Sequence, residues 1–91
     1  MKYEIKPTGK FRKDLRAIAK RGYNIDLISE VIRMLSLGDQ LSEKYKDHSL
    51  LGNSSGHREC HIMPDWLLIY KIEADILVLT LTRTGTHSDL F

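Results

Sequence analysis

The sequence contains a single cysteine, Cys60, and no long hydrophobic run. A lone cysteine cannot form a disulfide within the chain, which excludes a disulfide framework and favours a reducing compartment. No apolar segment approaches the ~20 residues that span a bilayer, and residues 1–7 lack the apolar core of a signal peptide. We therefore expect a cytoplasmic protein that has no membrane partner.

Cofactor and metal motifs are also scarce. There is no Cys-x-x-Cys pair, no phosphate-cradling glycine loop and no serine in a nucleophile elbow. The one candidate zinc set is His57, Cys60 and His61, but on a strand Cys60 points away from both histidines, and we expect it to be a small core residue. We therefore predict that the protein uses no cofactor and no metal.

Positive charge is concentrated near the N-terminus, although the net charge of the 91 residues is only +2. Such local charge attracts polyanions such as nucleic acids, whereas the ordinary alternative is a solvated helix face. The first 22 residues contain only two acidic side chains, Glu4 and Asp14. Their basic residues are Lys2, Lys6, Lys10, Arg12, Lys13, Arg16, Lys20 and Arg21.

The first half of the chain predicts a strand followed by two helices. Alternation over residues 3–7 indicates a short half-buried strand, after which Thr8 can cap a helix that stops near Gly22. Asn24 can cap a second helix that ends near Gly38. Each helix has one apolar stripe. The stripes are Phe11, Leu15, Ile18 and Ala19 in the first helix, and Ile28, Val31, Ile32 and Leu35 in the second.

The second half predicts three antiparallel strands, at about residues 57–63, 66–72 and 76–83. Turns at residues 64–65 and 73–75 connect them, and residues 52–56 form a turn or mobile loop. The strand at 66–72 is apolar on both faces, so we expect it to be central. The chain is thus predicted to be one α+β domain over residues 1–91, of order β-α-α-β-β-β, with two helices on a small antiparallel sheet.

Candidate catalytic side chains gather at one end of this predicted sheet. Alternation places Glu59 and His61 on one face of their strand, and the following turn presents Asp65 and Trp66 beside them. The C-terminal segment adds further polar and aromatic groups. They are Arg83, His87 and Phe91.

These residue types suit cleavage of RNA, whose own 2′-hydroxyl can attack the adjacent phosphate. The reaction needs a base, an acid and fixed positive charge, which histidine, aspartate and arginine supply. Trp66 or Phe91 could stack a base. Each residue also has a plainer interpretation: His48 could bond a loop carbonyl, Asp65 could be an ordinary turn residue, and Trp66 could belong to the core.

Three segments together resemble the YafQ-type toxins of the RelE/ParE superfamily, from bacterial type II toxin–antitoxin modules. They cover residues 45–52 (YKDHSLLG), 58–70 (RECHIMPDWLLIY) and 83–91 (RTGTHSDLF). The resemblance spans nearly the whole chain and implies the same α+β fold. It also implies an mRNA interferase that cuts mRNA in the ribosomal A site of the bacterial cytoplasm, neutralised by a cognate antitoxin.

The resemblance further implies an active site. Asp65 would be the general base, His87 the general acid and Arg83 the stabiliser of the charged phosphate. His48 and His61 would contact the scissile region, and Phe91 would orient a base, while Trp66 matches the pattern as well. The acid and base roles of these histidines and aspartate can exchange.

The basic first helix suggests a surface for ribosomal RNA, formed by Lys10, Lys13 and Arg16 among others. Two other functions remain open. One is a non-catalytic toxin of the same fold that inhibits a protein target such as gyrase, although relatives of that kind generally lack the histidines at 48, 61 and 87. The other is a nucleic-acid-binding or regulatory module without activity.

Overall fold

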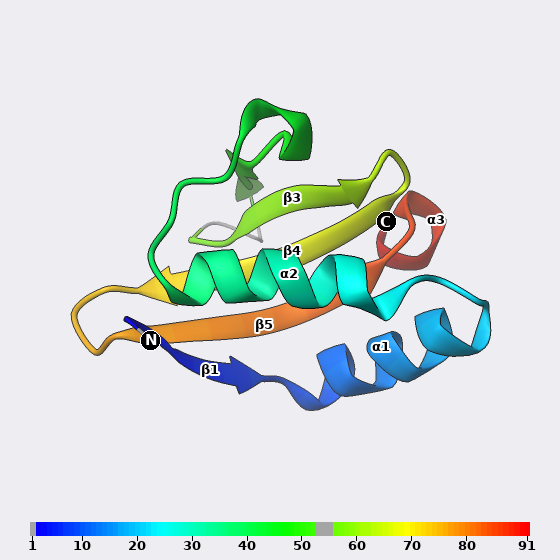
Figure 1. Cartoon of the computed structure of the whole chain (residues 1–91), viewed down its shortest axis with the longest axis horizontal. Coiled ribbons are helices and arrows are strands. Elements are labelled where there is room, and N and C mark those ends of the chain that lie inside the picture. The colour runs from blue at the N-terminus through cyan, green and yellow to red at the C-terminus, as the bar shows by residue number, and fades with distance from the viewer. Residues whose placement is uncertain (1, 53–55) are drawn as a thin grey trace.

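The computed structural model describes residues 2–52 and 56–91, and it contains a sheet with helices on one side (Figure 1). The predicted loop at residues 52–56 falls mostly on residues 53–55, outside the described residues. The elements in chain order are β1 (Glu4–Pro7), α1 (Gly9–Lys20), α2 (Ile25–Ser36), the 3-10 helix η1 (Glu43–Tyr45), β2 (His48–Ser49), β3 (Arg58–Met63), β4 (Trp66–Glu73), β5 (Val78–Gly85) and α3 (His87–Leu90).

The sheet is mixed, which corrects the predicted antiparallel sheet. Its strand order is β1-β5-β4-β3-β2, and β1 pairs with β5 in parallel, with Glu4 opposite Val78 and Pro7 opposite Leu81. Two short elements, β2 and α3, were also absent from the predicted order. Alternation identifies a strand but not its neighbour, and a two-residue strand is too short to show a period.

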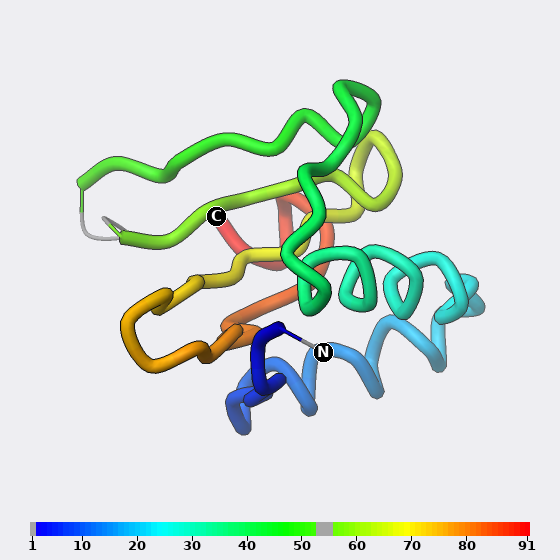
Figure 2. Tube along the Cα trace, turned by 60° about the vertical axis from the view of Figure 1, so that its left-hand side comes forward, coloured from blue at the N-terminus to red at the C-terminus, as the bar shows by residue number. Residues whose placement is uncertain are grey.

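Both predicted helices are present, with the predicted caps. The Thr8 hydroxyl accepts a hydrogen bond from the Phe11 amide at 3.0 Å, and the Asn24 side chain accepts one from Asp26 at the same distance. These caps satisfy amides that have no partner inside a helix. The two helices run in opposite directions along the sheet (Figures 1 and 2).

Within the described residues, no helix combines the length and the apolar character that crossing a bilayer requires.

The core lies between these helices and one face of the sheet. Its fully buried members include Ile18 of α1, Ile28 of α2 and Leu68 of β4. Strand β4 is central, as predicted, and its alternate face is buried too, through Leu67 and Ile69. A central strand that is covered on both faces fixes the positions of its neighbours on either side.

The last strand begins later than the predicted residue 76. Ile76 and Leu77 are exposed and lie in the turn at residues 74–77, where Leu77 has a positive φ of 55°. Their apolar character resembles a strand, but the left-handed backbone at Leu77 delays pairing until Val78. The register then runs to Gly85, which lies opposite Leu67, but it shifts where Ile69 pairs with Arg83 and Tyr70 with Leu81, so that Thr82 has no opposite residue.

Truncating the core should destabilise the protein far more than truncating this turn. For Leu68→Ala we expect a loss of about 2–5 kcal/mol in the free energy of unfolding, since the side chain is fully buried. For the control Ile76→Ala we expect a change within about 0.5 kcal/mol, since that side chain is 59% exposed. Urea unfolding followed by circular dichroism measures both, and equal losses would contradict the described core.

Candidate active site

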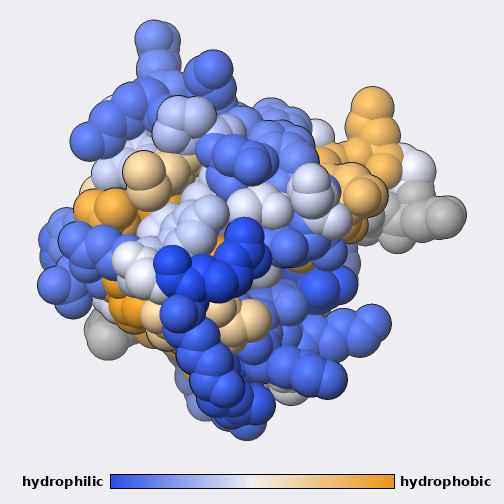
Figure 3. Space-filling view, turned by 90° about the vertical axis from the view of Figure 1, so that its right-hand side faces the viewer, coloured by the Kyte–Doolittle hydropathy of each residue, from blue (hydrophilic) through white to orange (hydrophobic). Residues whose placement is uncertain are grey.

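Three segments that are distant in the sequence meet at one end of the sheet. They are the β3–β4 turn, the short helix α3, and the segment from η1 to β2. Figure 1 shows α3 close to the β3–β4 turn, at the end of the molecule opposite the β4–β5 turn. Seen from that end, the surface is mostly hydrophilic, as a polar substrate requires (Figure 3).

The segment that carries His48 is held to the sheet by its neighbour Asp47. The Asp47 carboxylate accepts hydrogen bonds from the Arg58 guanidinium at 2.9 Å and from the Tyr70 hydroxyl at 2.5 Å. Arg58 also donates to the Ser49 hydroxyl at 2.8 Å. Burial and the adjacent Asp47 raise the pKa of Tyr70, so its hydroxyl stays a donor. This clamp places His48 directly opposite Glu59.

Two histidines of the site share one protonation pattern. His48 Nδ1 lies 2.8 Å from the Lys46 carbonyl oxygen, and His61 Nδ1 lies 3.3 Å from that of Pro64. A carbonyl oxygen can only accept a hydrogen bond, so each Nδ1 must carry the proton. In the neutral ring Nε2 is then the unprotonated nitrogen, ready to take up a proton.

Glu59 lies between these two rings and is a site residue that the sequence prediction missed. Its Oε1 is 3.4 Å from His48 Nε2 and 3.8 Å from His61 Nε2, and the residue is only 6% exposed. A buried carboxylate is costly unless it is partnered, and each imidazole can donate to Glu59 from Nε2 only when its ring is protonated. The signal was present in the sequence, because Glu59 and His61 share a strand face.

His87 is fixed by Asp65, across the gap between α3 and the β3–β4 turn. Asp65 Oδ1 accepts one hydrogen bond from His87 Nδ1 at 2.5 Å and a second from the His87 backbone amide at 2.9 Å. The backbone bond, followed by the side-chain bond, lowers the pKa of the Asp65 carboxyl below its usual range. The carboxylate therefore stays charged and holds the imidazole, leaving Nε2 for proton transfer.

The structure brings together four of the predicted residues, namely His48, His61, His87 and Asp65. The ring centroids of His48 and His61 are 6.4 Å apart, and those of His61 and His87 are 5.8 Å apart. Three imidazoles and two carboxylates thus form a continuous group, an arrangement that can move protons to and from one bound substrate.

Helix α3 is positioned by Asp89. Together with Thr86 it forms a capping box, and it accepts a hydrogen bond at 2.8 Å from Arg21, the residue that follows α1. The backbone hydrogen bond from Thr86, followed by that of Arg21, lowers the pKa of Asp89 to about 2. Gly85 makes room for this carboxylate, because an added Cβ there would lie 2.9 Å from Asp89 Cβ. The four-residue helix that carries His87 depends on these contacts.

Arg83 is not hydrogen-bonded to the histidines but to Asp14 of α1. Its Nε donates to Asp14 Oδ2 at 2.6 Å and its Nη2 to Asp14 Oδ1 at 3.1 Å. This ion pair raises the pKa of Arg83, so the guanidinium stays charged. Asp14 is a second residue that the sequence prediction missed, since nothing local in the sequence links two positions so far apart.

The two aromatic candidates differ in exposure. Trp66 is fully buried, where its Nε1 donates to the Thr84 hydroxyl at 2.9 Å and its ring meets Tyr23 edge-on. A buried ring offers no face to a base, so the core interpretation of Trp66 replaces the predicted stacking role. Phe91 is 71% exposed beside His87 and has the access that base stacking requires.

The basic residues of α1 are exposed, as a surface for a polyanion requires. Lys10, Lys13 and Arg16 all lie on the solvent side of the helix. Lys10 and Lys13 also line a shallow hollow together with Asp14 and Arg83. Positive charge therefore continues from the predicted RNA-binding helix to the arginine of the candidate site.

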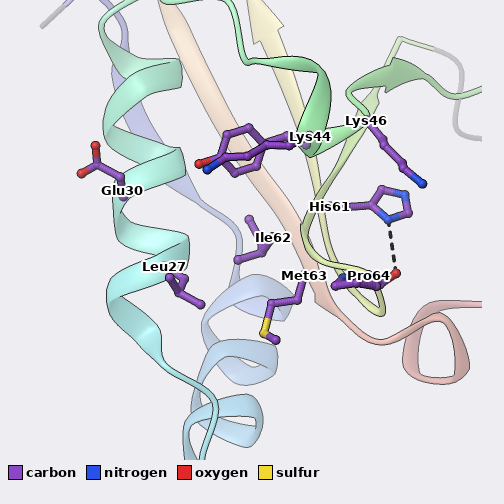
Figure 4. Close-up of a pocket in the computed structure, with 9 residues that line it drawn as sticks. Leu27, Glu30, Lys44, Lys46, His61, Ile62, Met63 and Pro64 are labelled. Atoms are coloured by element: carbon purple, nitrogen blue, oxygen red, sulfur yellow. Dashed lines mark hydrogen bonds between the residues drawn. The ribbon is translucent and has the colours of Figure 1, made fainter.

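A pocket of about 330 Å³ lies between α2 and the opposite side of β3. Figure 4 shows Leu27, Ile62 and Met63 pointing into the space between these elements, whereas His61 points to the other side of β3, toward Lys46. His61 is nevertheless among the residues that line the pocket, so the pocket reaches the edge of the histidine group. The opposite directions of Ile62 and His61 reflect the alternation of side chains along β3.

Cys60 lies in the core, as predicted. It is fully buried, and burial raises the pKa of its thiol to about 12, which makes it a poor nucleophile and a poor metal ligand. Among residues 2–52 and 56–91 no group of three or more metal-ligating side chains is placed to hold an ion.

The chain is similar to known proteins over almost its whole length. A family model described as "Bacterial toxin of type II toxin-antitoxin system, YafQ" matches residues 3–91. The mRNA interferase toxin YafQ of Escherichia coli K12 is 36% identical over 89 residues, covering 97% of this chain and 95% of the relative.

Solved structures are similar over almost the whole chain. A metal-bound toxin from Helicobacter pylori has a TM-score of 0.92 and 42% identity, covering 98% of this chain and 99% of that one. YafQ in the E. coli DinJ–YafQ complex has a TM-score of 0.89 and 36% identity, with 98% of each chain covered. Because the H. pylori toxin binds a metal, the absence of a metal from the present chain stays a prediction.

The lowered pKa of Asp89 predicts how stability changes with pH. A carboxyl whose folded-state pKa lies below its unfolded value stabilises the fold above the unfolded pKa, and this contribution is lost as pH falls through the folded pKa. Asp89→Asn should therefore be less stable than the parent at pH 7, and the difference should disappear as pH falls from about 4 to about 2. Urea unfolding at pH 7, 4 and 2 measures this.

Asp75→Asn provides the control, because it makes the same change of charge in an exposed turn. A difference for Asp89→Asn that stays constant over this pH range would contradict the role of the ionised carboxylate.

Proposed function

The chain belongs to the YafQ family of bacterial toxins from type II toxin–antitoxin systems, and on this basis we propose that it is an mRNA interferase of the bacterial cytoplasm. It would cut mRNA in the A site of the ribosome, and a cognate antitoxin would neutralise it. The related E. coli YafQ is called an mRNA interferase toxin and has been solved together with DinJ.

The observation that supports cleavage most strongly is the common orientation of three imidazoles. His48, His61 and His87 each use Nδ1 for a protein acceptor; Nε2 of His48 and of His61 then lies beside Glu59, and Nε2 of His87 has no acceptor among the described residues. A protein that only binds and inhibits a target such as gyrase has no need for such a group. The site thus favours general acid–base chemistry over the non-catalytic alternative.

The proposed reaction is attack by the RNA 2′-hydroxyl on its own phosphate. A base takes the hydroxyl proton, the 2′-oxygen forms a bond to phosphorus, and the bond from phosphorus to the 5′-oxygen breaks. An acid then protonates the departing 5′-oxygen, which yields a 2′,3′-cyclic phosphate and a 5′-hydroxyl. No water or metal is consumed, so the side chains of the chain itself can carry every proton transfer.

The roles that we propose differ from the role that the resemblance alone suggested for Asp65. Asp65 is engaged twice by His87 and has a lowered pKa, which favours an orienting carboxylate over a general base. His87 would be the acid, and the pair His48 and His61, linked through Glu59, would supply the base. Arg83 would stabilise charge on the phosphate, and Phe91 would stack on a base.

Removing His87 should abolish cleavage and preserve the fold. For His87→Ala we expect mRNA cutting on translating ribosomes to fall by about 10²–10⁴-fold, as for loss of a general acid. Ser88→Ala, the adjacent exposed position of α3, is the matched control and should retain activity. Primer extension on translated mRNA measures the cut. A His87→Ala protein that cuts as fast as the parent would disprove the catalytic assignment.

The basic face of α1 should contribute through phosphate contacts. Lys13→Glu together with Arg16→Glu should weaken ribosome binding and reduce its dependence on salt, because fewer counterions are released. Arg33→Glu, at an exposed position of α2, controls for the reversal of a single charge outside α1. Ribosome binding measured from about 50 to 200 mM salt should show a lower affinity and a smaller salt dependence for the double variant than for the parent. Equal affinity of the parent and the double variant across that series would exclude α1 as the RNA surface.

A further inference from the structure

Arg83 projects from the same face of the sheet as the histidine group, although its guanidinium is hydrogen-bonded to Asp14 of α1 and not to the histidines. Cross-strand pairing puts His48 opposite Glu59, Glu59 opposite Ile69, and Ile69 opposite Arg83. Residues that are directly opposite each other in antiparallel strands share a face. Arg83 is therefore the fourth member of a row that begins at His48, at the β5 end of that row.

At this end the edge of β5 is covered by α1 instead of by a strand. The β1 pairing stops where Pro7 meets Leu81, and the Thr8 hydroxyl then donates to the Thr82 carbonyl at 2.8 Å. Further along β5, Asp14 Oδ2 accepts a hydrogen bond from the Thr84 backbone amide at 3.2 Å. The carboxylate of Asp14 is thus fixed to the strand itself, and its side chain is only 16% exposed.

The Asp14 carboxylate binds the side of the Arg83 guanidinium that is formed by Nε and Nη2. The bonds from Nε and Nη2 use two of the five N–H groups of the guanidinium. One N–H group of Nη1 and the second one of Nη2 point in the same direction and form the edge at the end of the fork. Within the described residues, no side chain or carbonyl accepts a hydrogen bond from that edge. Such an edge matches two oxygens of one phosphate.

We propose that Asp14 is a positioning residue, which holds the Arg83 guanidinium side-on so that its free edge receives the scissile phosphate. The inference rests on the proposed function, because it assumes that Arg83 binds the phosphate of an RNA. A free arginine side chain populates many rotamers, and a guanidinium that is already fixed loses less conformational entropy when the phosphate arrives. Asp14 would then increase the rate of cleavage without itself touching RNA.

The test compares single-turnover mRNA cleavage on ribosomes by the parent, Asp14→Asn, Arg83→Ala and the double variant. Asp14→Asn keeps an oxygen for the Thr84 amide but presents an amide NH₂ group to the arginine. We expect it to reduce the cleavage rate about tenfold, with ribosome affinity changed less than twofold and an unaltered unfolding midpoint. Asp26→Asn, at an exposed position of α2, is the matched charge control and should cut mRNA as fast as the parent.

The double variant distinguishes positioning from a general structural role. We expect Arg83→Ala to reduce the rate by about 10²–10³-fold, the loss typical of one donor to a reacting oxyanion. Adding Asp14→Asn to Arg83→Ala should have no further effect, because no guanidinium remains to be held. A further tenfold loss in that background would show that Asp14 acts through the fold, and it would overturn the proposal.

Three other outcomes have separate meanings. If Asp14→Asn cuts as fast as the parent while Arg83→Ala does not, the positioning role is wrong and the proposed function stands. If Asp14→Asn cuts faster, Asp14 restrains Arg83 and the positioning role is again wrong. If the parent itself cuts no mRNA on ribosomes, the proposed function fails, and the inference fails with it.

Discussion

The pairing of β4 with β3 on one side and β5 on the other determines which side chains can meet at the candidate site. Leu67 pairs with both His61 and Gly85, and Ile69 pairs with both Glu59 and Arg83. Leu67 and Ile69, which point away from the helices, therefore determine which residues of β3 and β5 lie side by side on the face that carries the histidines. A shift of one residue in either pairing would turn the histidine or the arginine toward the helices. The fully buried core of β4 makes such a shift costly.

Short-range signals allowed much of the fold to be predicted from the sequence. The two capping residues, both helices, the central strand and the buried cysteine all follow from patterns within a few residues. The parallel partner of β5 and the strand β2 do not, because neighbouring strands are selected by packing across the whole domain. The start of β5 was misjudged because Ile76 and Leu77 are apolar residues in an exposed turn.

The candidate site shows the same division between local and distant contacts. Histidines and Asp65 could be identified from residue type and spacing, and the resemblance placed them in one set. Glu59 was passed over although alternation put it beside His61. Asp14 could not be found locally, since its partner lies on the last strand. For Trp66 the sequence left a core role and a stacking role open, because an indole can serve either, and only its burial decides for the core.

The contact between Gly85 and Asp89 has a consequence for how such a toxin can lose its activity. Even a methyl group at position 85 would push against the side chain that anchors α3, and His87 would move with the helix. The core between the helices and the sheet has no share in that contact. A single glycine-to-alanine change at position 85 would therefore displace His87 and give a protein that is folded but inactive.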